Sequence, residues 1–354
     1  MDIAFVSGNP HMPQVTGGVE INTHALAREL VRRGNTVCVL AKLSLRNRFG
    51  LWRAARLAAS GGSFWVDRDL GYPVFRSRRP AAHTSALPRP MVAVVQNGQM
   101  LDLAAGFARA AVPAVAYLHG LGFENWPAQP GDLPFRGYIA NSRFTAERFR
   151  RRFGLEPIVL PPLFRCDDYA TMATGSKVTF INPVAVKGVD LALQIASLCP
   201  RIPFAFVLGW PLSLRERTRL GREVAGLPNV ELRDRTTDMR TVYRDTRILL
   251  VPSQWEDETW GRVVSEAQFS GIPVVASDRG GLPEAVGPGG IVLPHDAPTR
   301  DWADTLAELW AGGTRYTELS EAALDHSRRP DLDPEQQVAT FIDTLRRAIG
   351  SETG

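Results

Sequence analysis

Short apolar runs alternate with helical patterns along nearly the whole of this 354-residue chain. Buried strands that alternate with helices form parallel sheets, joined by right-handed crossovers. We therefore predict an α/β protein with two doubly wound, Rossmann-like sheets. The predicted strands lie at residues 3–7, 36–40, 91–95, 114–118 and 138–140 in the first half, and at 178–181, 204–208, 230–232, 248–251, 274–276 and 291–293 in the second.

A proline-rich stretch from Pro157 to Arg165 interrupts this alternation. Because proline stiffens the chain and breaks helical periodicity, we expect the join between two domains here. The predicted domains are residues 1–164 and 165–354, both of ordinary domain size, and the join would act as a hinge. Apolar residues at helical spacing over 335–349, followed by Gly350, predict a final helix.

The composition is typical of a soluble globular protein, with 44% hydrophobic and 22% charged residues. No run of about 18 or more apolar residues occurs, so no membrane span is expected, and no secretory signal pattern opens the sequence. Three scattered cysteines, Cys38, Cys166 and Cys199, indicate neither a disulfide framework nor a zinc site. These features favour a cytoplasmic protein.

Charge is divided unevenly between the two halves. Residues 1–165 contain 21 Lys and Arg against 10 Asp and Glu, whereas the remainder contains 20 against 27. A basic first half suggests a phosphorylated acceptor, an anionic membrane surface or nucleic acid, or it simply keeps this half solvated. Because no zinc-finger, RNP-like or helix-turn-helix pattern occurs, we expect no nucleic-acid partner.

Residues 43–58 interleave arginines with leucines, Phe49 and Trp52. Such a helix either lies on an anionic bilayer or packs on the sheet with its arginine side chains reaching outward. We favour packing on the sheet and keep peripheral contact with the inner face of the membrane as the alternative.

The stretch from Glu258 to Glu266 follows an apolar run and a short loop. A helix beginning near Trp260 would offer free backbone N–H groups and a positive dipole end, which suit a phosphate. Glu266 would lie about 9 Å further along this helix at 1.5 Å per residue. Two carboxylates that accept hydroxyl hydrogen bonds on either side of a phosphate-binding turn match a sugar diphosphate. The pattern therefore predicts a nucleotide-sugar site.

The residues around these glutamates resemble the donor-site signature of the retaining GT-B-fold glycosyltransferases of family four. The shared set comprises Pro252, Ser253, Glu258, Gly261, Glu266, Gly271, Gly280, Gly281 and Glu284. Near the N-terminus, Gly17-Gly18-Val19-Glu20 and the helical pattern after it are similar to the family's first signature, in which the paired glycines face the reaction centre. The resemblance implies a GT-B fold, with two Rossmann-like domains facing a central cleft. The first would bind the acceptor and the second the donor, and the helix at 335–349 would cross back to the first.

The resemblance also implies roles for individual residues. His119 follows a predicted strand, and its counterpart in the family contacts the donor sugar near the reacting carbon. Glu258 would orient the sugar as the second catalytic residue, and Glu266 would bind the ribose. Trp126 either stacks on the acceptor or fills a hydrophobic hole.

One position departs from the family pattern in the diphosphate-binding segment. The family has an arginine five residues before the lysine that corresponds to Lys187, and this chain has Asn182 there. A neutral amide does not bind a phosphate as a guanidinium group does, because the guanidinium group is charged and can donate two parallel hydrogen bonds. Arg262 and Arg235 are candidates to compensate, and the backbone at Trp260 and Gly261 would complete the diphosphate site.

The expected function is transfer of a hexose, with retention of configuration, from a nucleoside-diphosphate sugar to a small-molecule or lipid-linked acceptor. Excess arginine over lysine suggests a GC-rich genome, and hence acceptors of cell-envelope or natural-product biosynthesis. We expect no cofactor and no metal, because the Asp-x-Asp pairs at Asp67 and Asp69 and at Asp331 and Asp333 read as solvated charge. The alternatives are a GT-B-fold epimerase or phosphorylase, and a sugar-nucleotide-binding pseudo-transferase that has lost turnover.

Overall fold

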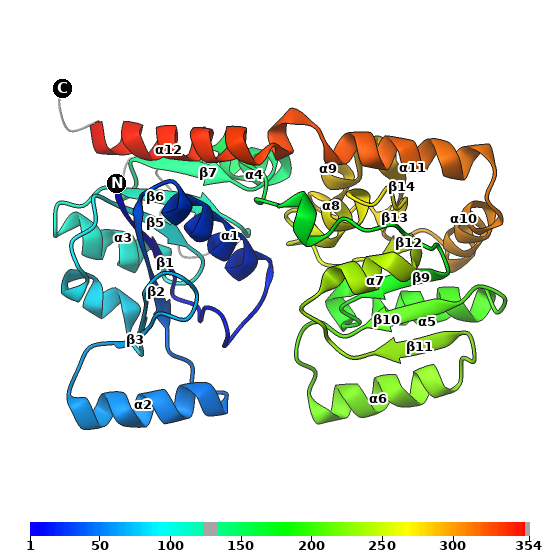
Figure 1. Ribbon diagram of the computed structural model, residues 1–354, viewed down its shortest axis with the longest axis horizontal. Helices are drawn as coiled ribbons and strands as arrows, with labels where there is room; N and C mark the ends of the chain where they lie inside the picture. The colour runs from blue at the N-terminus through cyan, green and yellow to red at the C-terminus, as the bar shows by residue number, and fades with distance from the viewer. Residues whose placement is uncertain (123–125, 127–132, 351–354) are drawn as a thin grey trace. The chain divides into compact units, whose positions relative to one another are not determined.

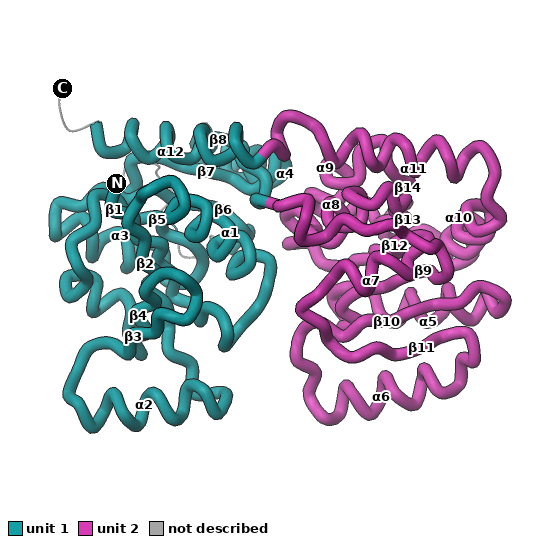
Figure 2. The backbone as a smooth tube through the Cα atoms, in the orientation of Figure 1, with its two compact units in different colours: residues 1–163, 334–354 teal, residues 164–333 magenta. Residues whose placement is uncertain are grey.

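The computed structural model describes residues 1–122, 126 and 133–350 (Figure 1). The chain forms two compact units, one comprising residues 1–163 and 334–354 and the other residues 164–333 (Figure 2). The last helix, α12 (Pro334–Gly350), therefore belongs to the first unit although the second unit precedes it in the sequence. The first unit ends one residue before the predicted boundary at 164.

The first unit is built on an eight-stranded sheet with the order β3-β4-β2-β1-β5-β6-β7-β8. Neighbouring strands are parallel except β3 and β4, which are antiparallel. The strands are β1 (Asp2–Val6), β2 (Thr36–Lys42), β3 (Trp65–Asp67), β4 (Val74–Ser77), β5 (Val92–Gln96), β6 (Ala114–Leu118), β7 (Gly137–Ala140) and β8 (Ile158–Val159). Central strands β5 and β6 are buried along their whole length, as expected of a parallel sheet covered on both faces.

Helices cover both faces of this sheet. The first cluster of the core packs α1 (Gly18–Arg32) and α12 on one face, where the rings of Phe5 and Phe341 stack at 5.8 Å. The second cluster packs α3 (Met100–Ala108) and α4 (Arg143–Phe153) on the other face. α2 (Arg48–Ser60) lies beside β3 and contributes Leu57 and Gly50 as its buried residues.

The second unit carries a six-stranded, all-parallel sheet with the order β11-β10-β9-β12-β13-β14. Its strands are β9 (Lys177–Ile181), β10 (Phe204–Val207), β11 (Val230–Arg233), β12 (Thr246–Val251), β13 (Val274–Ser277) and β14 (Gly290–Leu293). The helices are α5 (Val189–Leu198), α6 (Leu214–Ala225), α7 (Met239–Asp245), α8 (Arg262–Gln268), α9 (Leu282–Val286), α10 (Thr299–Ala311) and α11 (Thr314–Ser327). Both units are thus Rossmann-like, which confirms the predicted fold class.

Every strand predicted from the sequence is present, with ends that differ by at most two residues. Three strands were not predicted. β3 and β4 carry the buried charges Asp67 and Arg76, which hide the apolar pattern, and β8 has two residues between prolines.

The helix expected near Trp260 begins at Arg262 instead. Gly261 precedes it with φ of 81°, a left-handed conformation that favours glycine. Among the described residues, no helix is long and apolar enough to cross a bilayer.

Candidate functional site

The strand order of the second unit has a switch point between β9 and β12. From β9 the chain proceeds to β10 and β11 on one side, and it then continues to β12, β13 and β14 on the other. Ligands of open α/β sheets bind outside the carboxyl ends of the strands at such a switch point. Asn182 follows β9, Ser253 follows β12, and Gly280 and Gly281 follow β13. The residues singled out in the sequence therefore gather at one edge of this sheet.

Lys187 and Glu258 meet across the switch point. The ammonium group of Lys187, after β9, forms an ion pair with Oε2 of Glu258, after β12. The hydroxyl of Ser253 donates a hydrogen bond of 3.1 Å to the same carboxylate oxygen. Glu258 is 5% exposed, so this carboxylate is held almost entirely by protein groups. A cation and a carboxylate are thus placed side by side where a charged ligand would bind.

The paired glycines after β13 support the backbone of Glu258. Gly280 has φ of 57°, and a Cβ atom there would collide with the carbonyl oxygen of Glu258. The N–H of Gly281 donates to this same oxygen at 2.7 Å. A Cβ atom at Gly281 would collide with the carbonyl oxygen of Thr259. Both glycines are therefore required by close backbone packing, which fixes the position of Glu258.

Glu266 lies inside α8 and is 5% exposed. The hydroxyl of Tyr243, in α7, donates a hydrogen bond of 2.8 Å to Oε2 of Glu266. Arg262 forms an ion pair with Oε1, at an Nε–Oε1 distance of 3.4 Å. Burial raises the pKa of Glu266 more than the charge of Arg262 and the bond from Tyr243 lower it. Burial likewise raises the pKa of Tyr243, with the neighbouring Glu266 adding to the shift. Tyr243 was not singled out from the sequence as a site residue, and only the three-dimensional contact reveals its partner.

Arg262, a candidate to compensate at the diphosphate, is committed to other contacts, and the side chain of Trp260 is buried. Arg262 donates to the hydroxyl of Tyr169 at 3.0 Å and lies 4.3 Å from the ring centroid of Phe164, in addition to its ion pair with Glu266. Trp260 is 2% exposed, and its indole N–H donates to Ser265 Oγ at 3.1 Å. The side chain of Trp260 therefore belongs to the core, which leaves only its backbone for a ligand.

Arg235 lies outside the cluster that the structure brings together. It is exposed and follows β11, the edge strand of the sheet, whereas Lys187 and Glu258 follow β9 and β12.

Asn182 also has a contact that the sequence did not predict. Its φ of 68° is left-handed, a region that asparagine tolerates better than most residues. Its Oδ1 accepts a hydrogen bond of 2.8 Å from the backbone N–H of Trp210, after β10. The amide thus fixes a neighbouring loop of the same sheet edge.

The first unit has a second switch point, between β1 and β5. His119 follows β6 and is 8% exposed, with Nε2 at 2.9 Å from Oε1 of Gln96 at the end of β5. The same amide oxygen accepts a hydrogen bond of 3.1 Å from the hydroxyl of Thr23. The ring of His119 also lies 4.0 Å from that of Tyr117. These contacts orient the imidazole.

Gly17 and Gly18 open α1, as their pattern suggests. The N–H of Gly17 donates to Oε2 of Glu20 at 2.9 Å, so the glutamate caps the start of the helix. Burial raises the pKa of Glu20 against the lowering effect of backbone hydrogen bonds at its own position and at Gly17.

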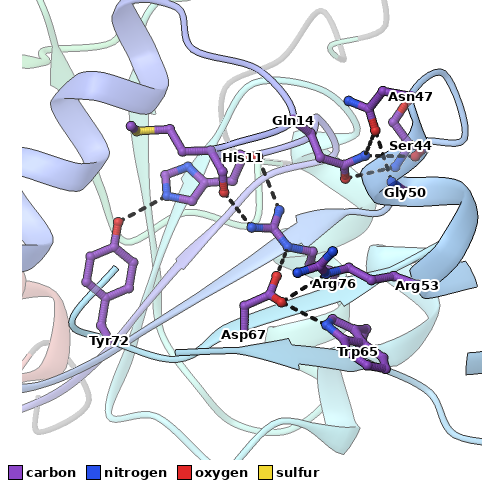
Figure 3. A network of polar contacts seen from close by, with 11 residues as sticks. His11, Gln14, Ser44, Asn47, Gly50, Arg53, Trp65, Asp67, Tyr72 and Arg76 are labelled. Atoms are coloured by element: carbon purple, nitrogen blue, oxygen red, sulfur yellow. Dashed lines mark hydrogen bonds and ion pairs between the residues drawn. The ribbon is translucent and has the colours of Figure 1, made fainter. Parts of the chain in front are cut away.

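A buried network anchors the loop that leads to these glycines (Figure 3). Arg76 is fully buried in β4, forms an ion pair with Asp67 and donates to the carbonyl oxygens of His11, at 3.1 Å, and of Met12. Gln14 donates to the carbonyl oxygen of Ser44 at 2.8 Å. The loop between β1 and α1 is therefore held by β4 and by the segment that follows β2.

The prediction that Asp67 is solvated charge is wrong. Asp67 is 8% exposed and accepts hydrogen bonds from Arg76, from Arg53 at 3.0 Å and from the indole of Trp65 at 2.7 Å. A buried arginine needs a counter-charge, and Asp67 supplies it.

Asp69 is exposed. In the second pair, Asp331 forms an ion pair of 3.0 Å with Nε of Arg329. Within the described residues, no group of three or more His, Cys, Asp or Glu side chains is arranged to hold a metal ion.

Trp126 packs among three aromatic rings. Its ring centroid lies 5.8 Å from Phe135, 5.3 Å from Phe149 and 5.5 Å from Phe153. This packing favours the second alternative for Trp126, the filling of a hydrophobic hole.

The segment at 43–58 packs on the first unit through one side of α2, as the favoured alternative predicts. Arg53 of α2 lies 3.3 Å from the ring centroid of Phe49 and pairs with Asp67, so this side of the helix is fixed to the unit. Leu51 and Trp52 are 54% and 50% exposed, and Arg56 lies 4.2 Å from the ring centroid of Trp52. The outer side of α2 is therefore both apolar and basic.

Comparison with known families matches both units. Residues 16–163 match the model of Glycosyltransferase Family 4, and residues 176–311 match that of the glycosyl transferases group 1. Among curated proteins, a D-inositol 3-phosphate glycosyltransferase of Mycobacterium leprae is 29% identical over 196 residues, which cover 51% of this chain and 43% of that protein. A protein of the same name from Saccharomonospora viridis is 42% identical over 120 residues, 33% of this chain and 26% of that protein. The chain thus aligns with less than half the length of these relatives.

Solved structures match over nearly the whole chain. Anabaena HepE in complex with UDP superposes with a TM-score of 0.75 at 17% identity, covering 98% of this chain and 100% of that one. A sucrose-phosphate synthase from Thermosynechococcus elongatus gives a TM-score of 0.72 at 15% identity and covers 99% of both chains. At these identities the likeness establishes the fold, and the family models establish the relationship. The chain belongs to the GT-B-fold glycosyltransferases of family four.

Proposed function

We propose that this protein transfers a hexose from a nucleoside-diphosphate sugar to a phosphorylated or lipid-linked acceptor, with retention of configuration. The observation that carries the proposal is the meeting of Lys187 and Glu258 across the switch point of the second sheet. Breaking the bond to the anomeric carbon develops positive charge on the sugar and negative charge on the departing diphosphate. A preorganised cation beside a carboxylate that can accept sugar hydroxyls meets both needs.

Glu266 supports the nucleotide end of this site. Its carboxylate is buried with one hydrogen bond at 2.8 Å and an ion pair at 3.4 Å, and its raised pKa indicates that these contacts do not fully offset the cost of burial. Hydroxyl groups of a ribose are neutral donors, and they would complete the hydrogen bonding of this carboxylate. We therefore assign the ribose to Glu266 and the sugar to Glu258. The contact of His119 with the donor sugar stays a prediction that the resemblance implies.

The nature of the donor and acceptor follows from the comparisons and from charge. Structural neighbours are described in complexes with UDP and with UDP-glucose, which makes a UDP-hexose the first donor to test. The relatives' name points to inositol 3-phosphate as acceptor. The first 165 residues, with 21 Lys and Arg against 10 Asp and Glu, suit such an anionic substrate. The proposed setting is the cytoplasm.

The decisive experiment separates binding from turnover. Thermal shift with UDP, GDP, ADP and dTDP identifies the nucleotide, and incubation of UDP-glucose with inositol 3-phosphate then tests transfer. We expect UDP to raise the melting temperature, an α-linked product to form, and Glu258→Gln to abolish most of the turnover. Failure of all four nucleotides to bind would overturn the proposal. Binding without product from any acceptor would favour the pseudo-transferase, and conversion of the donor without acceptor would favour the epimerase.

We further propose that transfer needs no divalent metal, because Lys187 would neutralise the departing diphosphate. The expected result is unchanged turnover in excess EDTA. Loss of turnover in EDTA that Mg²⁺ restores would contradict this part of the proposal.

A lipid-linked acceptor would bring the protein to a membrane surface through α2. Leu51 and Trp52 expose their apolar side chains beside Arg56, a combination that binds anionic interfaces. We expect vesicles containing anionic lipid to recruit the protein, less so at high salt. The double variant Leu51→Ser/Trp52→Ser should bind less. Absence of recruitment would favour a small soluble acceptor.

A further inference from the structure

Two tryptophans enclose the ammonium group of Lys187. Nζ lies 4.8 Å from the ring centroid of Trp255, on the loop after β12, and 5.3 Å from that of Trp210, on the loop after β10. The two indole rings pack edge to face, with centroids 5.8 Å apart and planes at 87°. Glu258 contacts the same ammonium group. One cation is therefore held by two aromatic rings and one carboxylate, which come from two different loops.

This arrangement restrains a side chain that is flexible by nature. Lysine carries a compact charge on a four-carbon stem and gives up considerable rotamer freedom when it binds a phosphate. Aromatic faces attract a cation through the ring quadrupole, and they do so without using any of its three N–H donors. The indoles can thus fix the position of Nζ and still leave its donors for a ligand.

Asn182 connects this enclosure to the departure from the family pattern. Its Oδ1 accepts the backbone N–H of Trp210 at 2.8 Å, and this bond sets the loop from which the indole projects. Arginine has no acceptor, so it could not make this bond. The φ of 68° at position 182 also disfavours arginine. The conformation of the loop therefore accounts for asparagine at this position, and a loss of phosphate binding need not be assumed.

We propose that Trp210 and Trp255 are positioning residues for Lys187, and that Asn182 acts through Trp210. The proposal rests on the function proposed above. When a nucleoside diphosphate binds, the ammonium group stays between the indoles and exchanges the Glu258 carboxylate for phosphate oxygens. Glu258 is then released to accept hydroxyls of the sugar. The family binds the diphosphate with an arginine and a lysine, whereas this chain would bind it with one lysine that the two indoles hold in place.

The test is a double-mutant cycle on UDP affinity, measured by calorimetry, with GDP, ADP and dTDP in parallel. Trp255→Phe keeps an aromatic face and should weaken binding less than Trp255→Leu, for which we expect about a threefold to tenfold loss. The same order is expected at Trp210. In a Lys187→Met background the change to Leu should have no further effect, because the cation is gone. An undiminished loss in that background would overturn the proposal, since it would mean that the indoles contact the nucleotide directly.

Trp310 provides a matched control. It is a partly buried tryptophan of the same unit, in α10, with the guanidinium of Arg247 at 5.6 Å from its ring centroid. Trp310→Leu should leave UDP affinity unchanged, and melting curves of all variants will report any loss of folding.

Variants at position 182 separate the role given to Asn182 from the alternative that this position lacks a phosphate ligand. Asn182→Gly keeps the left-handed backbone and removes the acceptor, so UDP affinity should fall by about as much as in Trp210→Leu. Asn182→Arg should also lower affinity, whereas an arginine that simply restored a missing phosphate ligand would raise it. A rise in Asn182→Arg would overturn the role given to Asn182. If wild-type protein binds none of the four nucleotides, the proposed function fails first, and the two failures are therefore distinguishable.

Discussion

Asp67 in the first unit and Glu266 in the second are both buried beside an arginine, and they differ in how far their contacts offset the cost of burial. Burial opposes ionisation of Asp67, but hydrogen bonds from Arg76, Trp65 and Arg53 outweigh it and hold its pKa below the ordinary value. Burial of Glu266 wins over Arg262 and Tyr243, so its pKa is raised. Asp67 accepts hydrogen bonds from three side chains, whereas Glu266 has a hydrogen bond from Tyr243 and an ion pair with Arg262.

This difference separates structural charge from charge available to a ligand. Asp67 and Arg76 close a network that fixes the loop before Gly17, and no further donor is needed there. Glu266, in α8 of the second unit, accepts a hydrogen bond from Tyr243 and pairs with Arg262, and the proposed function adds ribose hydroxyls to these contacts. Substitutions at the two positions should therefore have opposite consequences for folding and for binding.

The largest expected effect is on folding. Asp67→Asn leaves the fully buried Arg76 without its counter-charge, and breaking a buried pair in this way costs about 3–5 kcal/mol. Urea denaturation should show this loss in the free energy of unfolding of the first unit. Asp69→Asn, at the exposed neighbouring aspartate, is the control and should change stability by less than about 0.5 kcal/mol. A loss as small as that in Asp67→Asn would mean that the network does not support the fold.

The second effect should appear in binding. Glu266→Gln preserves shape and removes the charge, so hydrogen bonds from ribose hydroxyls lose a charged acceptor, which is worth about 1.5–3 kcal/mol or roughly 10- to 100-fold in affinity. Because the pKa of Glu266 is raised, the neutral side chain should not destabilise the second unit. Calorimetry with UDP and urea denaturation of the same variant measure the two quantities. Destabilisation with unchanged affinity would mean that Glu266, like Asp67, supports the fold and does not bind the ligand.

The third effect is on pH dependence, and its sign differs between the units. The pKa of Asp67 is lower in the folded protein, so its contribution to stability is present above about pH 4 and is lost as pH falls through the lowered pKa. The pKa of Glu266 is higher in the folded protein, so its contribution is present below about pH 4.3 and is lost as pH rises through the raised pKa.

Binding should reveal the raised pKa of Glu266 directly. A ribose that donates to the ionised carboxylate lowers this pKa, so UDP binding releases a proton at a pH near the raised value. Calorimetry in buffers of different ionisation enthalpy measures the release, and Glu266→Gln should abolish it. An equal release in the variant would assign the proton to another group.

The sequence predicted the features that depend on local pattern. Strand periodicity gave both sheets, and the motif around Glu258 correctly grouped it with the glycine pair of the next loop. The sequence pattern did not predict contacts that depend on strand order. Trp210 and Trp255 approach Lys187 from loops after two different strands. The pattern also misjudged Asp67, whose partner Arg76 lies in a strand with no apolar signature. The indole of Trp260 is part of the core, and the prediction concerned only the backbone at this position.

The smallest expected effect tests how far the binding site extends along the sheet edge. Arg235, predicted from the sequence to assist the diphosphate, is exposed after the edge strand β11, two positions from β9 in the sheet. A solvated arginine at that distance contributes through screened Coulomb interaction alone, so Arg235→Ala should change UDP affinity by less than about twofold. Lys187→Met should change it by at least about tenfold, because a charged hydrogen bond to phosphate is lost. Equal losses in the two variants would place the diphosphate nearer to β11 than to the switch point, and Glu266 would then lose its role as the ribose acceptor.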